Sequence, residues 1–503
     1  MRVATTHEGD PLSWAERHFG ELDLGDLRRN QRAVTIAAAM ASNPGGSIPQ
    51  MFSNSYDIKA SYNFFRHPEA TPENLQQAHS EAVLDRMHSK PGQYLLLEDT
   101  SEMSWSGNAP VKGLGPSGTG KSGEQGFHLH SVLAIGWRGA RDGDGNSGGG
   151  QEWPGRQAVE VLGLATQHYH VREPRPKGEP AKNNSKVLKY RKRESEWWQQ
   201  AGEAIGHAPE KKKIQWTRVC DRGADIYEQL ISCAELNHRF VIRAAQDRCL
   251  SDSEGRKITG KLFEVARKQP ALGRFALQLR ARGTGLRRQP ARKAELQVSV
   301  ADVWVRAPQR PGKGPGYLPA IRCRVVRVWE VEGKGKARKQ PPQQRLEWIL
   351  LTDWEATTYD EALEVALVYS TRWLIEEFHK AIKTGTKAEH LQLERAESLF
   401  AAIAIKSVVA LRLLDLRERV QVDEGAAAEE SGLNELELAV LRQRLNRPIK
   451  TVREVALAIG RLGGHMNRKS DGMPGWQTLF LGMRKLNDLV EGVRLALKLK
   501  RFG

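Results

Sequence analysis

The middle of the chain alternates short apolar runs with helical patterns, which predicts an α/β domain over residues 76–395. GQYLLLEDTSEMSW has a continuous apolar run that ends in two acids, as a buried strand does. TRVCDRGADIYEQLISCAEL predicts a strand end followed by a helix. Further strands are predicted for HLHSVLAIGW, AVEVLGLATQHYHV, RFVIRAA and LEWILLT.

A different pattern interrupts this domain at about residues 257–345. FALQLRAR, AELQVSV, VWVRA and IRCRVVRVWEVE alternate or nearly alternate between apolar and polar positions, which favours antiparallel strands. Their joins are rich in Gly, Pro, Lys and Arg, as in RARGTGLRRQPARK. We therefore expect a basic antiparallel β subdomain, inserted into the α/β domain.

Both ends of the chain are predicted to be helical. Residues 1–75 contain LGDLRRNQRAVTIAAAMA and SYDIKASYNFFRHPEATPENL. Basic side chains on the turns of these helices suit DNA contact, although a solvated charged face is the plain alternative. Residues 396–503 begin with a long apolar helix and continue with shorter ones, which serve either subunit association or capping of the core. The candidate DNA contacts in the N-terminal unit are Arg28, Arg29, Arg32 and Arg66.

One predicted helix, YSTRWLIEEFHKAIK, carries a polar stripe opposite an apolar face. Tyr369, Arg372, Glu376 and Lys383 fall within about 60° of one another at helical spacing, and Lys380 lies on the same stripe. One carboxylate among cations and a phenol suits phosphate chemistry, because the acid can hold a metal while Arg and Lys bind phosphate oxygens.

Two further acids stand at the ends of predicted strands, Asp99 in LLLEDT and Asp221 in VCDRGAD. With Glu376 they form a set of oxygen ligands that suits two Mg²⁺ ions, with Mn²⁺ as a possible substitute. Acids this far apart in sequence meet only through the fold, and a strand-end Asp is often a turn residue. The neighbouring acids Glu98, Glu102, Asp225 and Glu377 are alternative ligands.

Composition narrows the partners of the protein. The 503 residues include 77 basic and 60 acidic ones, which leaves a formal net charge of +17. Nucleic acid is the leading polyanionic partner, and an anionic membrane is the competing one. The sequence has no signal peptide and no apolar run of about 18 residues, so we expect no membrane contact. Its four cysteines form no CxxC pair, which favours a reduced intracellular protein without structural zinc.

The segments LEDTSEMSW, VCDRGADIYEQL and YSTRWLIEEFHKAIKTG together resemble the DDE transposases of bacterial insertion sequences. Within that family they are most similar to the transposon-five branch, which carries a Y-x2-R-x3-E-x6-K motif. WAERHFGELDLGDLRRNQR resembles the family's N-terminal DNA-binding segment, and AIGRLGGHM its C-terminal part. The resemblance therefore covers nearly the whole chain.

The resemblance implies a ribonuclease-H-like core with a β insertion, between an N-terminal DNA-binding domain and a C-terminal dimerisation domain. It implies Asp99, Asp221 and Glu376 as metal-binding catalytic residues. Tyr369, Arg372 and Lys383 would contact the transposon end, with Lys380 as a neighbouring candidate. Arg243 and Trp348 match positions that hold a flipped base, although Trp348 is otherwise read as a core aromatic.

The activity implied is cut-and-paste transposition by a homodimer that joins two ends of double-stranded DNA. Water nicks one strand, the freed 3′-OH attacks the other strand to leave a hairpin, and the reopened end joins target DNA. The resemblance places such an enzyme in the bacterial cytoplasm, at the nucleoid. The alternative is a transposase descendant that binds DNA without cutting it.

Two other motifs point to different chemistry. GPSGTGKS at residues 115–122 fits the P-loop pattern, but a loop precedes it and a loop and strand are predicted after it. We therefore expect no nucleotide cofactor, and a P-loop ATPase is the weakest functional alternative. His128 and His130, and His168 and His170, form His-x-His pairs that are predicted to be satisfied or solvent-facing rather than metal ligands.

Overall fold

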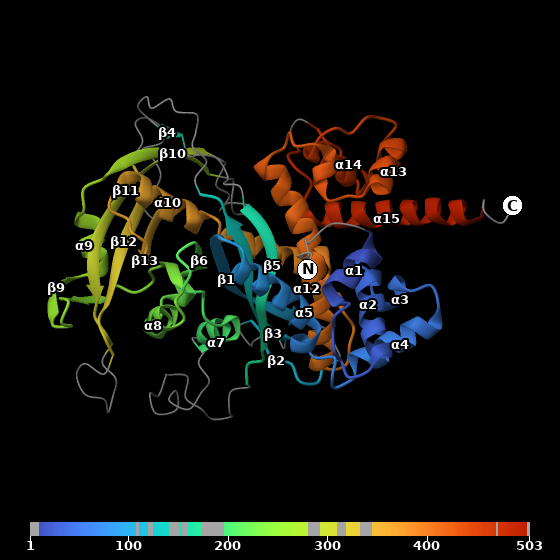
Figure 1. The fold of residues 1–503 in the computed structure, drawn as a ribbon, viewed down its shortest axis with the longest axis horizontal. Coiled ribbons are helices and arrows are strands. Elements are labelled where there is room, and N and C mark those ends of the chain that lie inside the picture. Colours follow the sequence, from blue (N-terminus) through green and yellow to red (C-terminus); the bar gives the residue numbers. More distant parts are fainter. Residues whose placement is uncertain are drawn as a thin grey trace.

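A mixed sheet, flanked on one side by a large helical region, forms the body of the protein (Figure 1). The computed structural model describes residues 10–106, 110–118, 124–139, 151–152, 159–173, 196–279, 292–308, 318–331, 345–468 and 471–499. In this part of the chain the main strand order is β2-β3-β1-β6-β7-β13-β12-β11-β10-β4, and β5 pairs with β3. The predicted α/β class with helical ends is confirmed.

Five strands form the half of the sheet that lies next to the helices. β3 is antiparallel to β1 and to β5, whereas β6 is parallel to β1 and to β7. Their bounds are β1 Gly92–Trp105, β3 Gln125–Trp137, β5 Val159–His170, β6 Ile214–Cys220 and β7 Arg239–Arg243. These are the strands expected from the apolar runs, and most of their residues are buried because helices cover both faces.

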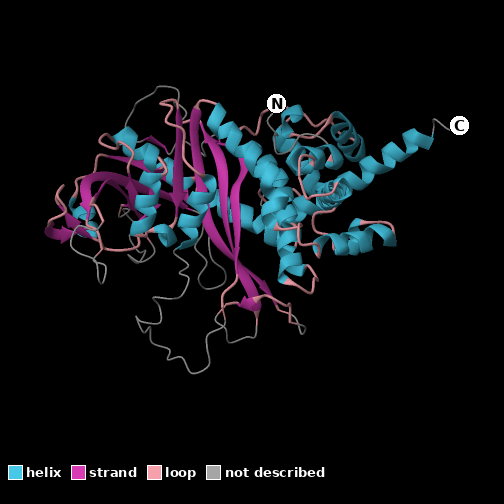
Figure 2. Ribbon diagram, turned by 60° about the horizontal axis from the view of Figure 1, so that its bottom comes forward, coloured by secondary structure: helices cyan, strands magenta, loops and turns pink. Residues whose placement is uncertain are grey.

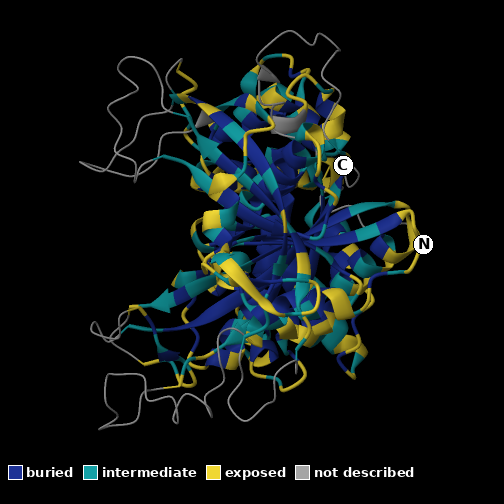
Figure 3. Cartoon of the chain, turned by 90° about the vertical axis from the view of Figure 1, so that its left-hand side faces the viewer, coloured by how far each residue is buried: buried dark blue, intermediate teal, exposed yellow. Residues whose placement is uncertain are grey.

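The alternation of side chains along β1 distributes its residues between two cores. Leu95 and Leu97 pack with helices α11 (Trp373–Lys380) and α12 (Ala396–Val422) on one face. Leu96 packs on the other face with α7 (Glu196–Ile205) and the end of α5 (Pro72–Ser89). Figure 3 shows the buried residues concentrated along the middle of the sheet.

The predicted β insertion extends the same sheet instead of forming a separate one. β13 (Glu347–Thr352) pairs antiparallel with β7, and the remaining strands continue outward from it. A helix, α9, lies within this region, and β8 begins before the expected boundary at residue 257. The other bounds are β8 Cys249–Ser251, β9 Lys257–Lys261, α9 Leu262–Lys268, β10 Gly273–Leu279, β11 Arg292–Val305 and β12 Ile321–Glu330. The short strands β2 (Gly115–Pro116) and β4 (Gln151–Glu152) and helix α8 (Tyr227–Glu235) complete the α/β part.

The N-terminal helices begin at residues whose side chains cap free backbone N–H groups. Asp10 accepts from Leu12 N and Ser13 N at the start of α1, and Asp26 accepts from Arg28 N at the start of α2. The helices are α1 Pro11–Phe19, α2 Leu27–Ser42, α3 Ile48–Met51 and α4 Ser55–Phe65. Their apolar faces join the main core, so this unit is docked on the protein.

Helix α12 is the central support of the helical region, which Figure 2 shows gathered beside the sheet. Its buried Lys406 donates from Nζ to the carbonyls of Pro44 (2.8 Å) and Thr386 (2.7 Å). One side chain thus joins the N-terminal unit and the segment after α11 to α12. The helices that follow are α13 Glu435–Leu445, α14 Val452–Leu462 and α15 Trp476–Leu499. Within the described residues, no helix has both the length and the apolar character needed to cross a membrane.

We predict that Gly163→Ala lowers the free energy of unfolding by about 1–3 kcal/mol, as overpacking of a tight site does. Gly163 has φ +144°, and a Cβ there would lie 2.6 Å from His79 Nε2 and 2.8 Å from Val83 Cγ2. His79 Nε2 accepts from Leu164 N, so the ring has little freedom to move away. Urea unfolding measures the change. Gly492→Ala is the control, because its Cβ would meet open space on α15 and should not destabilise the protein.

Candidate active site

Asp99 and Asp221 are brought side by side by the parallel pairing of β1 with β6. The register pairs Glu98 with Cys220 as its last partners; Asp99 is the next residue of β1, and Asp221 directly follows β6. Asp221 caps the short turn that follows, accepting from Gly223 N at 2.7 Å. The strand ends predicted from LLLEDT and VCDRGAD therefore meet at one place on the sheet.

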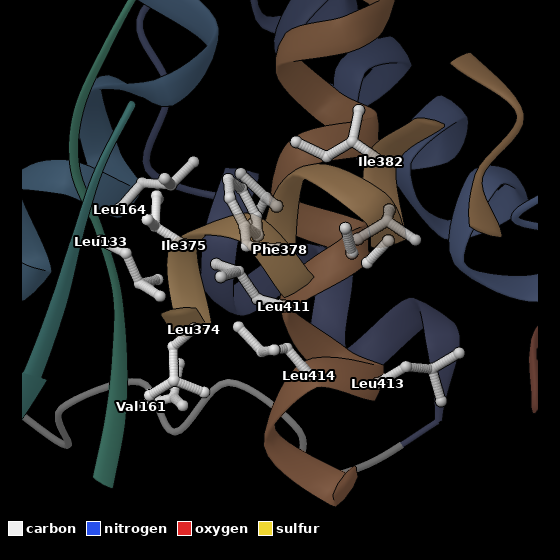
Figure 4. Packing of buried hydrophobic residues seen from close by; sticks show 14 of the residues in the cluster. Leu133, Val161, Leu164, Leu374, Ile375, Phe378, Ile382, Leu411, Leu413 and Leu414 are labelled. Atoms are coloured by element: carbon white, nitrogen blue, oxygen red, sulfur yellow. The ribbon is translucent and has the colours of Figure 1, made fainter. Parts of the chain in front are cut away.

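The expected single helix over residues 369–383 is wrong, because the segment is divided into three. Helix α10 (Tyr359–Ser370) ends just after Tyr369, α11 begins after Arg372, and a π-helical turn, η5 (Ala381–Gly385), carries Lys383. A helical repeat alone cannot show such breaks. The apolar face predicted for this segment is nevertheless buried (Figure 4), where Leu374, Ile375 and Phe378 lie between β3, β5 and α12.

Arg372 links the two elements that carry the acids. Its Nη1 lies 3.4 Å from Asp99 Oδ2, and its Nη2 contacts Glu376 Oε1. The side chain of Arg372 is 16% exposed, so these contacts are made largely out of water. The guanidinium therefore offsets part of the repulsion between Asp99 and Glu376.

The pKa of Asp99 responds to its burial and to both other acids. Burial raises this pKa from 3.8 to about 6, and the charges of Asp221 and Glu376 raise it too, while Arg372 opposes them. Interactions of this kind require near neighbours. Asp221 and Glu376 thus both act on the charge of Asp99. Up to 155 positions of the sequence separate consecutive members of this group.

These acids fit a hard divalent cation in their chemistry, since all their donors are carboxylate oxygens with excess negative charge. In the described part of the chain, however, no three His, Cys, Asp or Glu side chains converge as the ligands of one ion would. The contacts of Arg372 with Asp99 and Glu376 turn these carboxylates toward its guanidinium instead. The carboxylates therefore have the right chemistry for a divalent cation, but in the described structure their oxygens do not point at one common position.

An aromatic and basic group lies beside the acids. The rings of Trp348 and Tyr369 meet edge to face, with centroids 5.2 Å apart. Arg243 shares a side-chain hydrogen bond with Tyr369 and donates to the carbonyl of Glu347 at 2.9 Å. Tyr369 is buried, whereas Trp348 is half-buried and packs at the edge of the core. Four residues predicted as DNA contacts, Arg243, Trp348, Tyr369 and Arg372, are thus close together.

The two lysines of the motif segment differ in their surroundings. Lys383 donates to the carbonyl of Glu102 on β1 and lies 3.9 Å from Glu389 Oε1, which places it near the strand of Asp99. Lys380 instead pairs with Glu377 at 2.8 Å, and 56% of its side chain is exposed. The shared stripe predicted for Lys380 and Glu376 is thus replaced by a pairing of Lys380 with the next acid.

Comparison with protein families identifies both ends of the chain. Residues 11–70 match a model described as transposase DNA-binding, and residues 427–503 match the transposase Tn5 dimerisation domain. These two matches support a Tn5-like transposase. The first match covers α1–α4, and the second covers the helices from α13 to α15. They support DNA binding and dimer formation by this transposase.

The arginines predicted as DNA contacts are placed differently within the matched N-terminal segment. Arg28 is 91% exposed, and Arg66 is 54% exposed, near Glu394. Arg29 donates to the carbonyl of Leu24, and Arg32 pairs with Asp57 on α4. Arg29 and Arg32 therefore have roles inside the N-terminal unit of the transposase, whereas Arg28 and Arg66 present more of their charge to solvent.

A buried ion pair beneath the acids was missed by sequence reasoning. Arg218 and Glu98 are both fully buried and hydrogen bonded, with 2.9 Å from Arg218 Nε to Glu98 Oε2. His130 Nε2 lies 2.9 Å from Glu98 Oε1, so the network joins β1, β3 and β6 next to Asp99 and Asp221. A charge inside the apolar strand IQWTRVC was the available signal, because a buried charge needs a partner.

The four neighbouring acids that the sequence offered as alternative ligands form hydrogen bonds or ion pairs with other residues. The Asp225 carboxylate accepts hydrogen bonds from Ala245 N, Gln246 N and Arg248, so it has a structural role in the transposase. Glu102 accepts from Ser117 Oγ and Gly118 N. Glu98 is held by Arg218, and Glu377 is held by Lys380, Arg417 and Trp476.

The other motifs do not form sites in the described structure. Residues 115–116 of GPSGTGKS form β2, and β3 begins at Gln125, so a strand follows where a P-loop needs a helix. Residues 119–123 lie outside the described residues. His130 is buried and bonded to Glu98 and Thr100, as expected for a satisfied core histidine. Its cross-strand partner is His168, and His128 faces His170 in the same register.

We predict that Asp99→Asn stabilises the transposase by about 2–3 kcal/mol at pH 8, with the gain disappearing toward pH 4. The folded-state pKa of Asp99, about 6, lies above the ordinary value of 3.8. The wild type is therefore relieved of the cost of this charge at low pH and loses stability as pH rises through 6. Urea unfolding at several pH values measures the difference. Asp302→Asn is the control, since Arg322 and Arg324 pair with Asp302 and lower its pKa; an equal gain there would contradict the prediction.

Proposed function

We propose that this transposase uses Asp99, Asp221 and Glu376 as the catalytic acids of a DDE-type reaction on DNA. The observations that carry the proposal are geometric: the register of β1 with β6 sets Asp99 beside Asp221, and Arg372 contacts both Asp99 and Glu376. The three carboxylates would hold Mg²⁺, or Mn²⁺ in its place. Two such ions would supply Lewis-acid activation of water and stabilise the attacking and leaving oxygens of phosphoryl transfer.

The strand order supports a ribonuclease-H-like core for this chemistry. β5, β3, β1, β6 and β7 form a mixed sheet in which β1, β6 and β7 are parallel and β3 reverses direction. Asp99 lies on the central strand of this set, and Asp221 follows its parallel neighbour. We propose a DNA-binding domain at residues 1–75, this core at 76–395 with its β insertion at about 257–345, and a dimerisation domain at 396–503.

The basic and aromatic residues beside the acids would bind the transposon end. Tyr369 at the end of α10, Arg372 just before α11 and Lys383 in the π-helical turn suit contacts to phosphate oxygens. Binding of phosphate by Arg372 would draw its guanidinium from Asp99 and Glu376, which would leave these carboxylates available as ligands. Arg243 and Trp348 would hold a base that has left the duplex, with the indole face offsetting lost stacking.

The reaction proposed is cut-and-paste transposition without a covalent enzyme intermediate. Water first cuts one strand at the transposon end, and the 3′-OH then attacks the opposite strand to leave a hairpin. Hydrolysis reopens the hairpin, and the same 3′-OH joins target DNA. In each step one phosphoester bond forms as another breaks, so one set of acids serves the whole sequence. Tyr369 would act as a phosphate contact, because a reaction without a covalent intermediate needs no Tyr nucleophile.

We predict that Asp221→Asn and Glu376→Gln each lower strand cleavage by at least about 10³-fold, because the phosphate charge is no longer neutralised in the transition state. Binding of the terminal repeat should remain within a few-fold of the wild type. Cleavage of a labelled duplex and gel-shift titration measure the two effects. The matched control is Asp360→Asn, an exposed acid in the first turn of α10, which should cut normally. Full cleavage by Glu376→Gln would exclude the proposed acids.

A second function, DNA recognition without cleavage, would give a different result with the same DNA. A protein of that class binds the terminal repeat but leaves it uncut at any Mg²⁺ or Mn²⁺ concentration. The site favours the enzyme, because the pKa of Asp99 is raised by burial and then by the charge of Asp221, and perturbed carboxyl groups of this kind are common in active sites. Inverted repeats in the DNA flanking the reading frame supply the substrate.

We predict that Trp348→Ala weakens engagement of the cleaved end by about 1–3 kcal/mol, the cost of losing one stacked base. Trp348→Tyr should retain most of the effect, since a second aromatic face remains. Fluorescence of 2-aminopurine placed near the cleavage site measures unstacking of the base. The control is Trp329→Ala on β12. The centre of the Trp329 ring lies 4.2 Å from the guanidinium carbon of Arg327. Equal fluorescence in Trp348→Ala and the wild type would contradict this role.

A further inference from the structure

The first turn of α15 binds the helix that carries Glu376. Trp476, the first residue of α15, donates from Nε1 to Glu377 Oε2 at 2.7 Å. The side chain of Glu377 is 7% exposed, so this contact is buried. Glu377 directly follows Glu376 on α11, and neighbouring residues of a helix point about 100° apart. A contact that fixes Glu377 therefore also fixes the rotation of α11, and with it the direction in which the backbone of Glu376 presents its side chain.

Arg417 of α12 completes the contact. Its Nη1 binds the same Oε2 atom, and its guanidinium carbon lies 4.7 Å from the centre of the Trp476 ring. Lys380 binds the other oxygen, Oε1, at 2.8 Å. The carboxylate of Glu377 is thus held by one residue from each of three helices, α11, α12 and α15. We call Glu377, Arg417 and Trp476 the Glu377 junction.

A second contact of α15 lies eight residues farther along the catalytic segment. Phe480, one turn after Trp476, packs on Gly385 at the end of the π-helical turn. A Cβ at Gly385 would lie 2.0 Å from Phe480 Cε2, so the ring fits only against a glycine. The two contacts of α15 are at Glu377 and Gly385, and Lys383 lies between them. The helix therefore contacts the motif segment on both sides of Lys383, at one end directly beside Glu376.

The same helix also belongs to the region that matches the dimerisation model. Residues 427–503 include all of α15, whose far end exposes Leu495, Leu497 and Leu499. Nearer its start, Leu479, Met483 and Leu486 are buried against the rest of the protein. A helix of this kind transmits its position along its length, because its backbone hydrogen bonds resist bending. A partner that binds the far end can therefore affect the Glu377 junction.

We propose that Glu377 is a positioning residue, through which the C-terminal helix α15 sets the orientation of Glu376 toward Asp99 and so makes cleavage depend on how α15 is seated. This inference rests on the proposed role of Glu376. It assigns to Trp476 and Arg417 a part in turnover, although neither contacts the catalytic acids in the described structure. Simple capping of the core by α15 would instead make these residues contribute to stability alone.

The test compares full-length Trp476→Phe, Glu377→Gln and the double variant with the wild type. Trp476→Phe keeps the ring but removes the N–H donor, and Glu377→Gln keeps an acceptor but removes the charge. Each single variant should lower the cleavage rate at saturating end DNA by about 10- to 100-fold, as misplaced catalytic groups do. Because both act through one contact, the double variant should cleave no more than about twofold slower than the slower single variant. End binding and the dimer mass from light scattering should stay unchanged.

Trp216→Phe is the matched control, because it also removes a buried indole hydrogen bond, to the carbonyl of Met87, far from α15. It should lower the melting temperature but leave the cleavage rate within twofold. The inference is overturned if Trp476→Phe cleaves like the wild type, or if it loses end binding or dimers together with cleavage. Failure of the proposed function gives a separate signature, in which the wild type itself does not cut or Glu376→Gln cuts normally.

Discussion

Repulsion among Asp99, Asp221 and Glu376 is the constraint around which this structure is organised. Burial raises the pKa of Asp99 most, and the charges of Asp221 and Glu376 raise it further, so both the burial and the clustering of these acids oppose folding. Arg372 offsets part of this cost by binding Asp99 and Glu376. The surrounding structure offsets the rest of this unfavourable energy. The buried Arg218–Glu98 pair joins the strands, and α12 packs against the helix of Glu376. Sites that need concentrated charge for chemistry commonly reduce stability in this way.

Helix α12 and its neighbours make the site a junction of all parts of the protein. Lys406 joins α12 to the N-terminal unit and to the segment after the π-helical turn, and Arg417 joins it to Glu377. The segment that carries Glu376 therefore contacts the sheet, the long helix and the C-terminal helix at once. If the sheet, α12 or α15 changed position, the packed side chains between them and this segment would shift the acids. Under the role proposed for Glu377, this arrangement would link subunit association to cleavage.

Apolar runs predicted the five strands of the core well, because a strand buried on both faces has few polar residues. The burial of Leu374, Ile375 and Phe378 was also predictable, since helical spacing places them on one face. The division of the motif segment into α10, α11 and a π-helical turn was not. Such breaks depend on partners from other parts of the chain, among them Phe480 against Gly385 and Lys383 at the carbonyl of Glu102.

The sequence by itself determined which residues have the chemistry for phosphoryl transfer and which segments form strands and helices, because residue type and periodicity are local properties. The family matches at both ends agree with the resemblance to a Tn5-like transposase. Only the tertiary structure decided that Asp99 and Asp221 stand side by side, since this follows from the register of β1 with β6. It also decided that Lys380 binds Glu377 and that Trp476 reaches the same acid. Those contacts join residues up to 99 positions apart, and no local pattern encodes which partner a buried charge will find.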